Sequence, residues 1–232
     1  MKNILITGAT SGIGREIAAT LIKGNDLFLT GRKKIDRINY FTCDLMDIFD
    51  VETLFEKATE YFNSGIDVLI NCAGQYLYKP IEDMQIDEIS YLLDVNFKSA
   101  YYLSSLVIPK MKENRWGRII NIGSISGVVG EANATLYSAT KSAFTGLTKA
   151  LALEVAQYNI TVNQINPGWV ETPLTQNALN NEERQEVIDI TPQKRFVTPK
   201  EIAKLCQYLI TEEARGITGQ GINVCAGLTC GC

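Results

Sequence analysis

Short apolar runs alternate with longer amphipathic segments along this chain, and that alternation constrains its fold more than any other feature. The interiors of the apolar runs are nearly continuous, which is typical of strands buried on both faces of a sheet. They predict seven strands, at residues 2–7, 26–30, 40–43, 67–71, 118–122, 161–166 and 221–224. The amphipathic segments predict helices at residues 13–23, 51–62, 86–112, 136–158 and 199–210.

Strands that alternate with helices form βαβ units and hence a parallel sheet. The 232 residues contain no repeat, low-complexity tract or linker. We therefore predict one α/β domain over residues 1–232, a Rossmann-type doubly wound sheet of about seven parallel strands. Between Arg32, after the second strand, and Tyr40, which opens the third, only residues 33–39 remain, whereas a parallel crossover usually needs a dozen residues or more. The helix expected there should be shortened or absent.

Composition excludes several classes of protein. The chain has no histidine, which removes Ser-His-Asp and Cys-His catalysis and histidine-containing zinc sites. A net charge of −4 argues against nucleic acid as a partner. Its six cysteines form no Cys-x-x-Cys pair, and Cys230 and Cys232 are more typical of a tail with free thiols than of a metal site. We predict that no metal is bound.

No apolar stretch approaches the roughly 18 residues of a membrane span. The first predicted strand starts at the beginning of the chain, with no signal-like segment before it. We therefore expect a cytoplasmic protein with no membrane partner.

A glycine-rich turn, Thr-Gly-Ala-Thr-Ser-Gly-Ile-Gly at residues 7–14, joins the first strand to the first helix. Glycines at such a turn let backbone N–H groups approach a pyrophosphate, which the positive end of the helix also attracts. The alternative is a tight turn rich in small residues. Because the turn is the first βα connection of the chain, we favour nucleotide binding.

Tyr137 and Lys141 lie one turn apart on the predicted helix at residues 136–158, so their side chains share a face within about 6 Å. A nearby ammonium favours the phenolate, and a tyrosine whose pKa is lowered can act as a general acid or base. Taken alone, the same spacing is common on helix surfaces.

Ser124 follows the predicted fifth strand, at the sheet edge where open α/β folds bind ligands. Without a histidine it lacks a base for hydrolysis, but its hydroxyl can donate to a carbonyl oxygen.

Several of these motifs occur together in the order and spacing of one family. They are the turn at residues 7–14, Asn71-x-Ala73-Gly74, Asn96, Ser124, Tyr137-x-x-x-Lys141, Pro167-Gly168 and the last strand at residues 218–224. The chain as a whole resembles the classical short-chain dehydrogenases/reductases. Within that family it looks closest to the 3-oxoacyl-carrier-protein reductases.

By this resemblance, the catalytic residues are Asn96, Ser124, Tyr137 and Lys141. Tyr137 would be the general acid or base, and Lys141 would lower its pKa and bind the nicotinamide ribose. Ser124 would hold the substrate oxygen, and Asn96 would fix a water that links Lys141 to solvent. The cofactor-binding residues implied are Gly8, Thr10, Ser11, Gly12, Ile13, Gly14, Arg32, Asp44, Leu45, Asn71, Ala73, Gly74, Tyr137, Lys141, Pro167, Gly168, Val170 and Thr172.

The end of the predicted second strand indicates which cofactor is used. An NAD enzyme needs a carboxylate there for the ribose 2′-hydroxyl, and residues 29–32 supply none. Arg32 offers a guanidinium suited to a 2′-phosphate. We therefore favour NADP(H), with NAD(H) as the alternative.

The sequence does not identify the substrate. A small-molecule ketone or alcohol is expected, under a cap formed by a loop and helix at about residues 169–198 that includes Trp169. Arg115 is a candidate for a basic rim that would suit an acidic carrier protein, but the helix end near Tyr158 carries no basic residue. A carrier-bound 3-oxoacyl group and a free small ketone both remain as substrates.

Three other functions are alternatives to an NADP(H)-dependent reductase. They are an NAD-dependent alcohol dehydrogenase, a lyase or epimerase that recycles its cofactor, and a non-catalytic NAD(P)-binding regulator that senses redox state. The resemblance also implies a homotetramer or homodimer formed through the two long helices.

Overall fold

A seven-stranded parallel sheet forms the centre of the molecule in the computed structural model, which describes residues 1–230. The strands are β1 Asn3–Ile6, β2 Asp26–Gly31, β3 Tyr40–Thr42, β4 Val68–Asn71, β5 Gly117–Ile122, β6 Ile160–Pro167 and β7 Gly221–Val224. Their order across the sheet is β3-β2-β1-β4-β5-β6-β7. This architecture confirms the predicted Rossmann-type fold.

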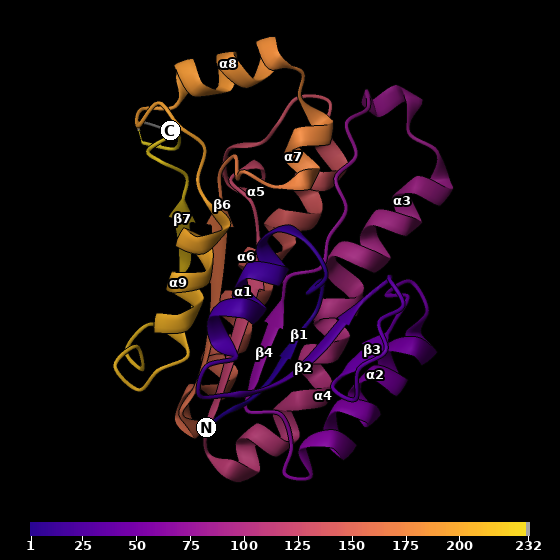
Figure 1. Ribbon diagram of the computed structural model, residues 1–232, viewed down its shortest axis with the longest axis vertical. Helices are drawn as coiled ribbons and strands as arrows, with labels where there is room; N and C mark the ends of the chain where they lie inside the picture. Colours follow the sequence, from indigo (N-terminus) through magenta and orange to yellow (C-terminus); the bar gives the residue numbers. More distant parts are fainter. Residues whose placement is uncertain (231–232) are drawn as a thin grey trace.

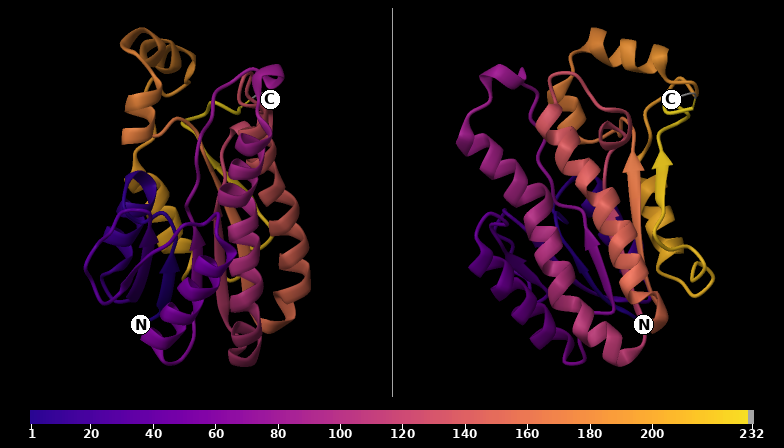
Figure 2. Two further views of the ribbon diagram at one scale, coloured as in Figure 1. Left: turned by 90° about the vertical axis from the view of Figure 1, so that its right-hand side faces the viewer. Right: turned by 180° about the vertical axis from the view of Figure 1, so that it is seen from behind.

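Helices cover both faces of the sheet, as Figures 1 and 2 show. The α-helices are α1 Gly12–Leu21, α2 Ile48–Phe62, α3 Ile86–Leu93, α4 Ser99–Asn114, α5 Ser126–Val129, α6 Thr135–Val155, α7 Pro173–Ala178, α8 Asn181–Ile190 and α9 Pro199–Leu209. Two short 3₁₀ turns are η1 Ile81–Asp83 and η3 Ala156–Tyr158, and η2 Asp94–Lys98 is a π-helical turn. None of the helices described is long and apolar enough to cross a membrane.

Alternate residues of each inner strand supply two separate cores. In β1, Ile4 and Ile6 pack under α1 and α9, whereas Leu5 packs on the opposite face under α2, α4 and α6. Successive side chains of a strand point to opposite faces, so a strand covered on both sides must be apolar throughout. This is why the strands appear in the sequence as continuous apolar runs.

The connection between β2 and β3 contains no helix, as predicted from its length. The Tyr40 hydroxyl ties it to the sheet by donating to the carbonyl oxygens of Gly31, at 2.9 Å, and Lys33, at 2.6 Å. The Asn39 amide also donates to the Leu27 carbonyl at 2.9 Å, but most residues of the segment are exposed, and Ile38 is 88% exposed.

The helix predicted at residues 86–112 contains a π bulge. α3, the π-helical turn η2 and α4 follow one another without a break in the helical backbone. A π turn inserts one extra residue and is frequent at functional sites. Here it contains Asn96, whose side chain is fully buried.

From β1 the strand order first proceeds to one side of the sheet, with β2 and β3, and then reverses to the other side, with β4 to β7. Open α/β sheets bind ligands in the crevice outside the carboxyl ends of their strands at such a reversal. Figure 1 shows α7 and α8 standing beyond this edge of the sheet. The fold therefore places the candidate site between β1 and β4 and below these two helices.

Candidate active site

The turn after β1 is built for close approach of a ligand to the backbone. Gly8 has φ +68°, and a Cβ there would lie 2.8 Å from the Cα of Ala73. A Cβ on Gly14 would overlap the carbonyl oxygen of Gly8. Ser11, the N-cap residue of α1, makes no side-chain cap hydrogen bond, and the first turn of α1 carries no acidic residue. The free N–H groups and positive end of α1 fit a pyrophosphate.

Thr7 joins this turn to the end of β4. Its hydroxyl accepts hydrogen bonds from the backbone N–H groups of Cys72, at 3.0 Å, and Ala73, at 3.1 Å. The predicted motif at residues 71–74 is thereby held beside the glycine turn. A cofactor lying across the crevice would meet both segments.

Asn96 and Lys141 both approach Gly74. A Cβ on Gly74 would lie 3.1 Å from the Lys141 Nζ and 3.6 Å from the Asn96 Oδ1, so only glycine leaves this space open. Asn96 is fixed by the backbone of Gln75, accepting from its N–H at 2.7 Å and donating to its carbonyl at 2.9 Å. The π turn thus brings Asn96 next to Lys141, 45 positions further along the chain.

Ser124 lies just beyond β5 at the same edge. Its hydroxyl donates to the Ser126 hydroxyl at 3.0 Å and accepts from the Ser126 backbone N–H at 3.1 Å. Ser126 in turn donates to the Glu131 carboxylate at 2.7 Å. Ser124 is therefore the first member of a short hydrogen-bonded chain that ends on a carboxylate.

Burial has the largest effect on the pKa of the Tyr137 phenol. Burial raises its pKa to about 12, hydrogen bonding with Ser124 opposes that rise, and the Glu131 charge adds to it. The ammonium of Lys141 lies 5.8 Å from the centre of the Tyr137 ring. The pKa of Tyr137 is therefore raised in the protein alone. The lowering by Lys141 that the resemblance implies stays a prediction.

Lys141 is buried at the base of the site, with 3% of its surface exposed. Its ammonium donates to the Ile122 carbonyl at 2.9 Å. Burial lowers its pKa from 10.5 to about 8, so charging this side chain is costly in the folded protein.

Ser124, Tyr137 and Lys141 line one cavity of about 360 Å³. The predicted residues that line it are Ile13, Gly74, Ser124, Tyr137, Lys141, Pro167, Gly168, Val170 and Thr172. Trp169 also lines it, together with Leu174 of α7 and Ile190 of α8. The role of residues 169–198 as a cap over a substrate stays a prediction. This cavity has the size of a small-molecule site.

Four other predicted cofactor residues do not line this cavity. Arg32 is exposed at the end of β2, where its guanidinium donates to the Tyr91 hydroxyl of α3 at 3.3 Å. Asp44 and Leu45 follow β3 on the same flank. The Asn71 amide is buried and donates to Asn121 at 2.9 Å, so its side chain supports the sheet from within. Their contacts with a cofactor stay predictions.

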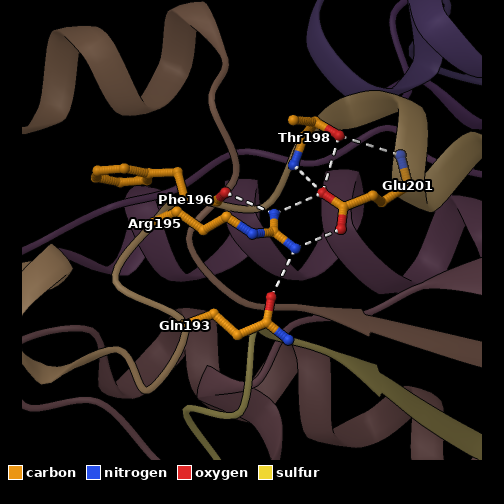
Figure 3. Close-up of polar contacts among 5 residues, drawn as sticks. All are labelled: Gln193, Arg195, Phe196, Thr198 and Glu201. Atoms are coloured by element: carbon orange, nitrogen blue, oxygen red, sulfur yellow. Dashed lines mark hydrogen bonds and ion pairs between the residues drawn. The ribbon is translucent and has the colours of Figure 1, made fainter.

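The capping segment is anchored at both of its ends. Thr172 is the N-cap of α7 and lies against Gly12 of the glycine turn. The Arg184 guanidinium of α8 donates to the Glu171 carboxylate at 2.6 Å. At the far end, Arg195 binds both carboxylate oxygens of Glu201, at 2.8 and 2.9 Å, which fixes the return of the chain into α9 (Figure 3).

The structure adds three side chains to the site that sequence analysis missed. Tyr76 lies edge-on to Tyr137, with ring centroids 5.0 Å apart, and donates to the other Glu131 oxygen at 2.6 Å. Ser126 completes the link to Ser124. A signal for Glu131 was present, since it is the only charged residue between Ser124 and Tyr137. Leu228 and Thr229 also line the cavity, from a segment with no recognisable motif.

Arg115 contradicts its prediction as part of a basic rim. It follows α4 and precedes β5, at the amino edge of the sheet, and it donates to the Gln157 carbonyl at 3.1 Å. Tyr158 lies at this same edge, so neither residue bears on the substrate. Among residues 1–230, no group of three or more histidine, cysteine or acidic side chains is placed to bind a metal, and Cys232 lies outside the described residues.

The fold and site together define a nucleotide-binding α/β protein with serine, tyrosine and lysine side chains in one cavity. A family model described as enoyl-(acyl carrier protein) reductase matches residues 8–229. The chain is 38% identical over 238 residues to the 3-oxoacyl-[acyl-carrier-protein] reductase of Buchnera aphidicola, covering 98% of this chain and 97% of that protein. It is 34% identical over 251 residues to the D-beta-hydroxybutyrate dehydrogenase of Cupriavidus necator, covering 97% of each.

Solved structures agree with these sequence relationships. A variant of actinorhodin polyketide ketoreductase with NADPH superposes with a TM-score of 0.91 at 33% identity, covering 97% of this chain and 96% of that one. The aldohexose dehydrogenase of Thermoplasma acidophilum also gives 0.91, at 30% identity, covering 98% and 94%. The protein belongs to the short-chain dehydrogenase/reductase family of oxidoreductases.

Proposed function

We propose that this protein is an NADP(H)-dependent oxidoreductase that interconverts a ketone and a secondary alcohol, with Tyr137 as the general acid and base. The observation that carries the proposal is the convergence of Ser124, Tyr137 and Lys141 on one cavity beside a glycine turn suited to a dinucleotide. When bound, the nicotinamide would supply or accept the hydride.

The side chains of this chain account for the remaining steps. In reduction, the Ser124 hydroxyl turns from Ser126 and donates to the substrate oxygen, which polarises the carbonyl. Tyr137 then delivers its phenolic proton to that oxygen. Its raised pKa keeps the phenol protonated at neutral pH, which is the form that the acid role requires. Lys141 would hold the nicotinamide ribose, and Asn96 would position a water beside it.

The test is to incubate the purified protein with NADPH or NADH and a panel of neutral ketones, and to follow cofactor oxidation. Turnover with NADPH supports the proposal. Tight NADPH binding without turnover of any carbonyl compound would favour the redox-sensing regulator instead. Turnover with NADH alone would favour the NAD-dependent alcohol dehydrogenase.

Arg32 is the basis for proposing NADP(H) over NAD(H). Its exposed guanidinium at the end of β2 is free to add a charge-assisted hydrogen bond to a 2′-phosphate. Such a bond contributes about 1.5–3 kcal/mol. We therefore expect Arg32→Ala to weaken NADPH binding roughly 10- to 100-fold while leaving NADH binding unchanged.

Fluorescence titration of both cofactors would measure this effect. Arg215→Ala, which removes an exposed arginine at the amino edge of the sheet, is the matched control. A preference for NADPH that survives Arg32→Ala would contradict the assignment of the 2′-phosphate to Arg32.

The relatives differ in what their names say they act on. One acts on a 3-oxoacyl group carried by a protein and another on hydroxybutyrate, a carboxylate. For this chain we propose a small ketone or alcohol, either free or carrier-bound. The cytoplasmic location stays a prediction.

We also propose that the protein forms a homotetramer or homodimer through α4 and α6. Each of these helices exposes a large apolar side chain, since Tyr101 is 55% and Leu153 84% exposed. Gly146 of α6 leaves open space beside the helix. Light scattering would test this proposal, and a monomer at micromolar concentration would contradict it.

A further inference from the structure

Glu131 gives the substrate cavity an unusual charge distribution. Glu131 and Lys141 are the only charged side chains that line the cavity among the residues described. Lys141 lies buried at its base and donates to a backbone carbonyl. The part of the wall formed by Tyr76, Ser126 and Glu131 therefore carries a carboxylate and no cation.

The Glu131 carboxylate is fixed in place. Its Oε1 accepts from the Tyr76 hydroxyl at 2.6 Å and its Oε2 accepts from the Ser126 hydroxyl at 2.7 Å. No arginine or lysine in the described part of the chain forms an ion pair with it. Each oxygen keeps a second lone pair. The negative charge is therefore balanced only by neutral donors.

Glu131 is also close to the reacting groups. Two hydrogen bonds, of 2.7 and 3.0 Å, connect it through Ser126 to Ser124. Tyr76, its other partner, packs edge-on against Tyr137. The Glu131 charge is one cause of the raised pKa of Tyr137, so its field reaches the phenol. A substrate whose carbonyl oxygen lies between Ser124 and Tyr137 must place its neighbouring atoms in this field.

We propose that Glu131 is a specificity-determining residue that selects uncharged ketones and alcohols and rejects substrates bearing a carboxylate. This inference rests on the proposed function and narrows its substrate class. A 3-oxo acid carries its carboxylate one methylene group from the ketone. In this cavity that carboxylate meets a like charge or the uncharged cap residues Trp169, Leu174 and Ile190, and no free cation offsets its desolvation. The corresponding ester or thioester carries no such penalty.

The experiment compares acetoacetate with methyl acetoacetate, first as substrates with NADPH and then as ligands by calorimetry. For the wild type we expect the acid to be at least about 10-fold poorer than the ester, in kcat/KM and in affinity. Glu131→Gln removes the charge but keeps an amide that can accept from Ser126 and contact Tyr76. It should bring the two compounds to within about 3-fold of each other, mainly by improving the acid.

Two further variants separate charge from structure. Glu82→Gln removes the same charge from the exposed turn η1 and should leave the acid-to-ester ratio unchanged. Ser126→Ala breaks the link to Ser124 but keeps the carboxylate, so it should slow both compounds and preserve their ratio.

The outcomes also separate this inference from the proposed function. A wild type that takes acid and ester equally, or a Glu131→Gln variant in which the acid gains neither rate nor affinity, would overturn the role of Glu131. Failure to reduce any ketone would refute the proposed function, but the calorimetric comparison would still report on the charge of the cavity.

Discussion

Replacing Tyr137 with phenylalanine is expected to lower kcat/KM for ketone reduction by about 10³-fold, because general acid catalysis contributes roughly 10²- to 10⁴-fold. The phenol is the one group in the cavity that combines an acidic proton with hydrogen bonding to Ser124. Phenylalanine keeps the ring that packs against Tyr76, so the cavity should retain its shape. Steady-state kinetics with any ketone found to be a substrate would measure the loss.

Two controls give this result its meaning. The thermal unfolding midpoint of Tyr137→Phe should match that of the wild type, because only one hydroxyl is removed, and the variant should still bind NADPH. A variant that keeps activity within a few-fold of wild type would show that another group supplies the proton, and Tyr137 would lose its proposed role.

The direction of the reaction should also respond to pH. Alcohol oxidation needs the phenolate as a base, and burial holds the pKa of Tyr137 above its ordinary value. The oxidation rate should therefore rise with pH through the alkaline range, while reduction needs the protonated phenol and should not rise. This difference should disappear in Tyr137→Phe.

Replacing Lys141 with methionine is expected to abolish most of the activity and yet to stabilise the protein at neutral pH. Burial lowers the pKa of Lys141 from 10.5 to about 8, which corresponds to a cost on the order of 3 kcal/mol for folding with a charged lysine. Methionine has a similar length and no charge. Loss of the hydrogen bond to Ile122 offsets about 1 kcal/mol of the gain.

The pH dependence of this stabilisation has a definite sign. Between pH 8 and 10.5 the unfolded chain holds a proton on Lys141 that the folded protein has released, so the free energy of unfolding of the wild type rises with pH over that window. The variant lacks this rise. Its advantage should be fully present below pH 8 and gone above about 10.5.

Urea unfolding at several pH values would measure both curves. Lys149→Met, which removes an exposed lysine from the same helix, should change stability little at any pH and is the matched control. Tyr137 ionises in both proteins, so its contribution cancels in the difference. A Lys141→Met variant less stable than wild type at pH 7 would show that the buried ammonium is better compensated than its contacts indicate.

The stability cost at Lys141 and the raised pKa of Tyr137 have a common origin. Lys141 is buried and Tyr137 half-buried in a cavity whose charged lining, among the residues described, is limited to Lys141 and Glu131. Fixed polar groups in such a site act strongly on charge that develops during reaction. The burial that costs stability at Lys141 would therefore strengthen the electrostatic effects on the proposed reaction.

Much of the fold was predictable from local patterns. Nearly continuous apolar runs indicated strands covered on both faces, and the short connection between β2 and β3 indicated a missing helix. The helix predicted at residues 86–112 is continuous in the structure, but the π turn inside it was not predicted, because a π turn keeps nearly the same apolar periodicity while adding one residue. Periodicity reports which face is buried and is insensitive to such a local insertion.

The sequence by itself determined the parallel sheet and the glycine turn, because each depends on spacing within one or two neighbouring elements. Asn96, Ser124, Tyr137 and Lys141 were singled out together by the resemblance to a family. Only the tertiary structure decided the chemistry around them. In the tertiary structure Tyr76, Ser126 and Glu131 form one hydrogen-bonded network, and Arg115 lies at the edge of the sheet opposite the cavity. Desolvation of Tyr137 and Lys141 shifts the pKa values of both. Burial and charge depend on every element that packs around a group, and these contacts join residues far apart in the chain, which sequence spacing does not encode.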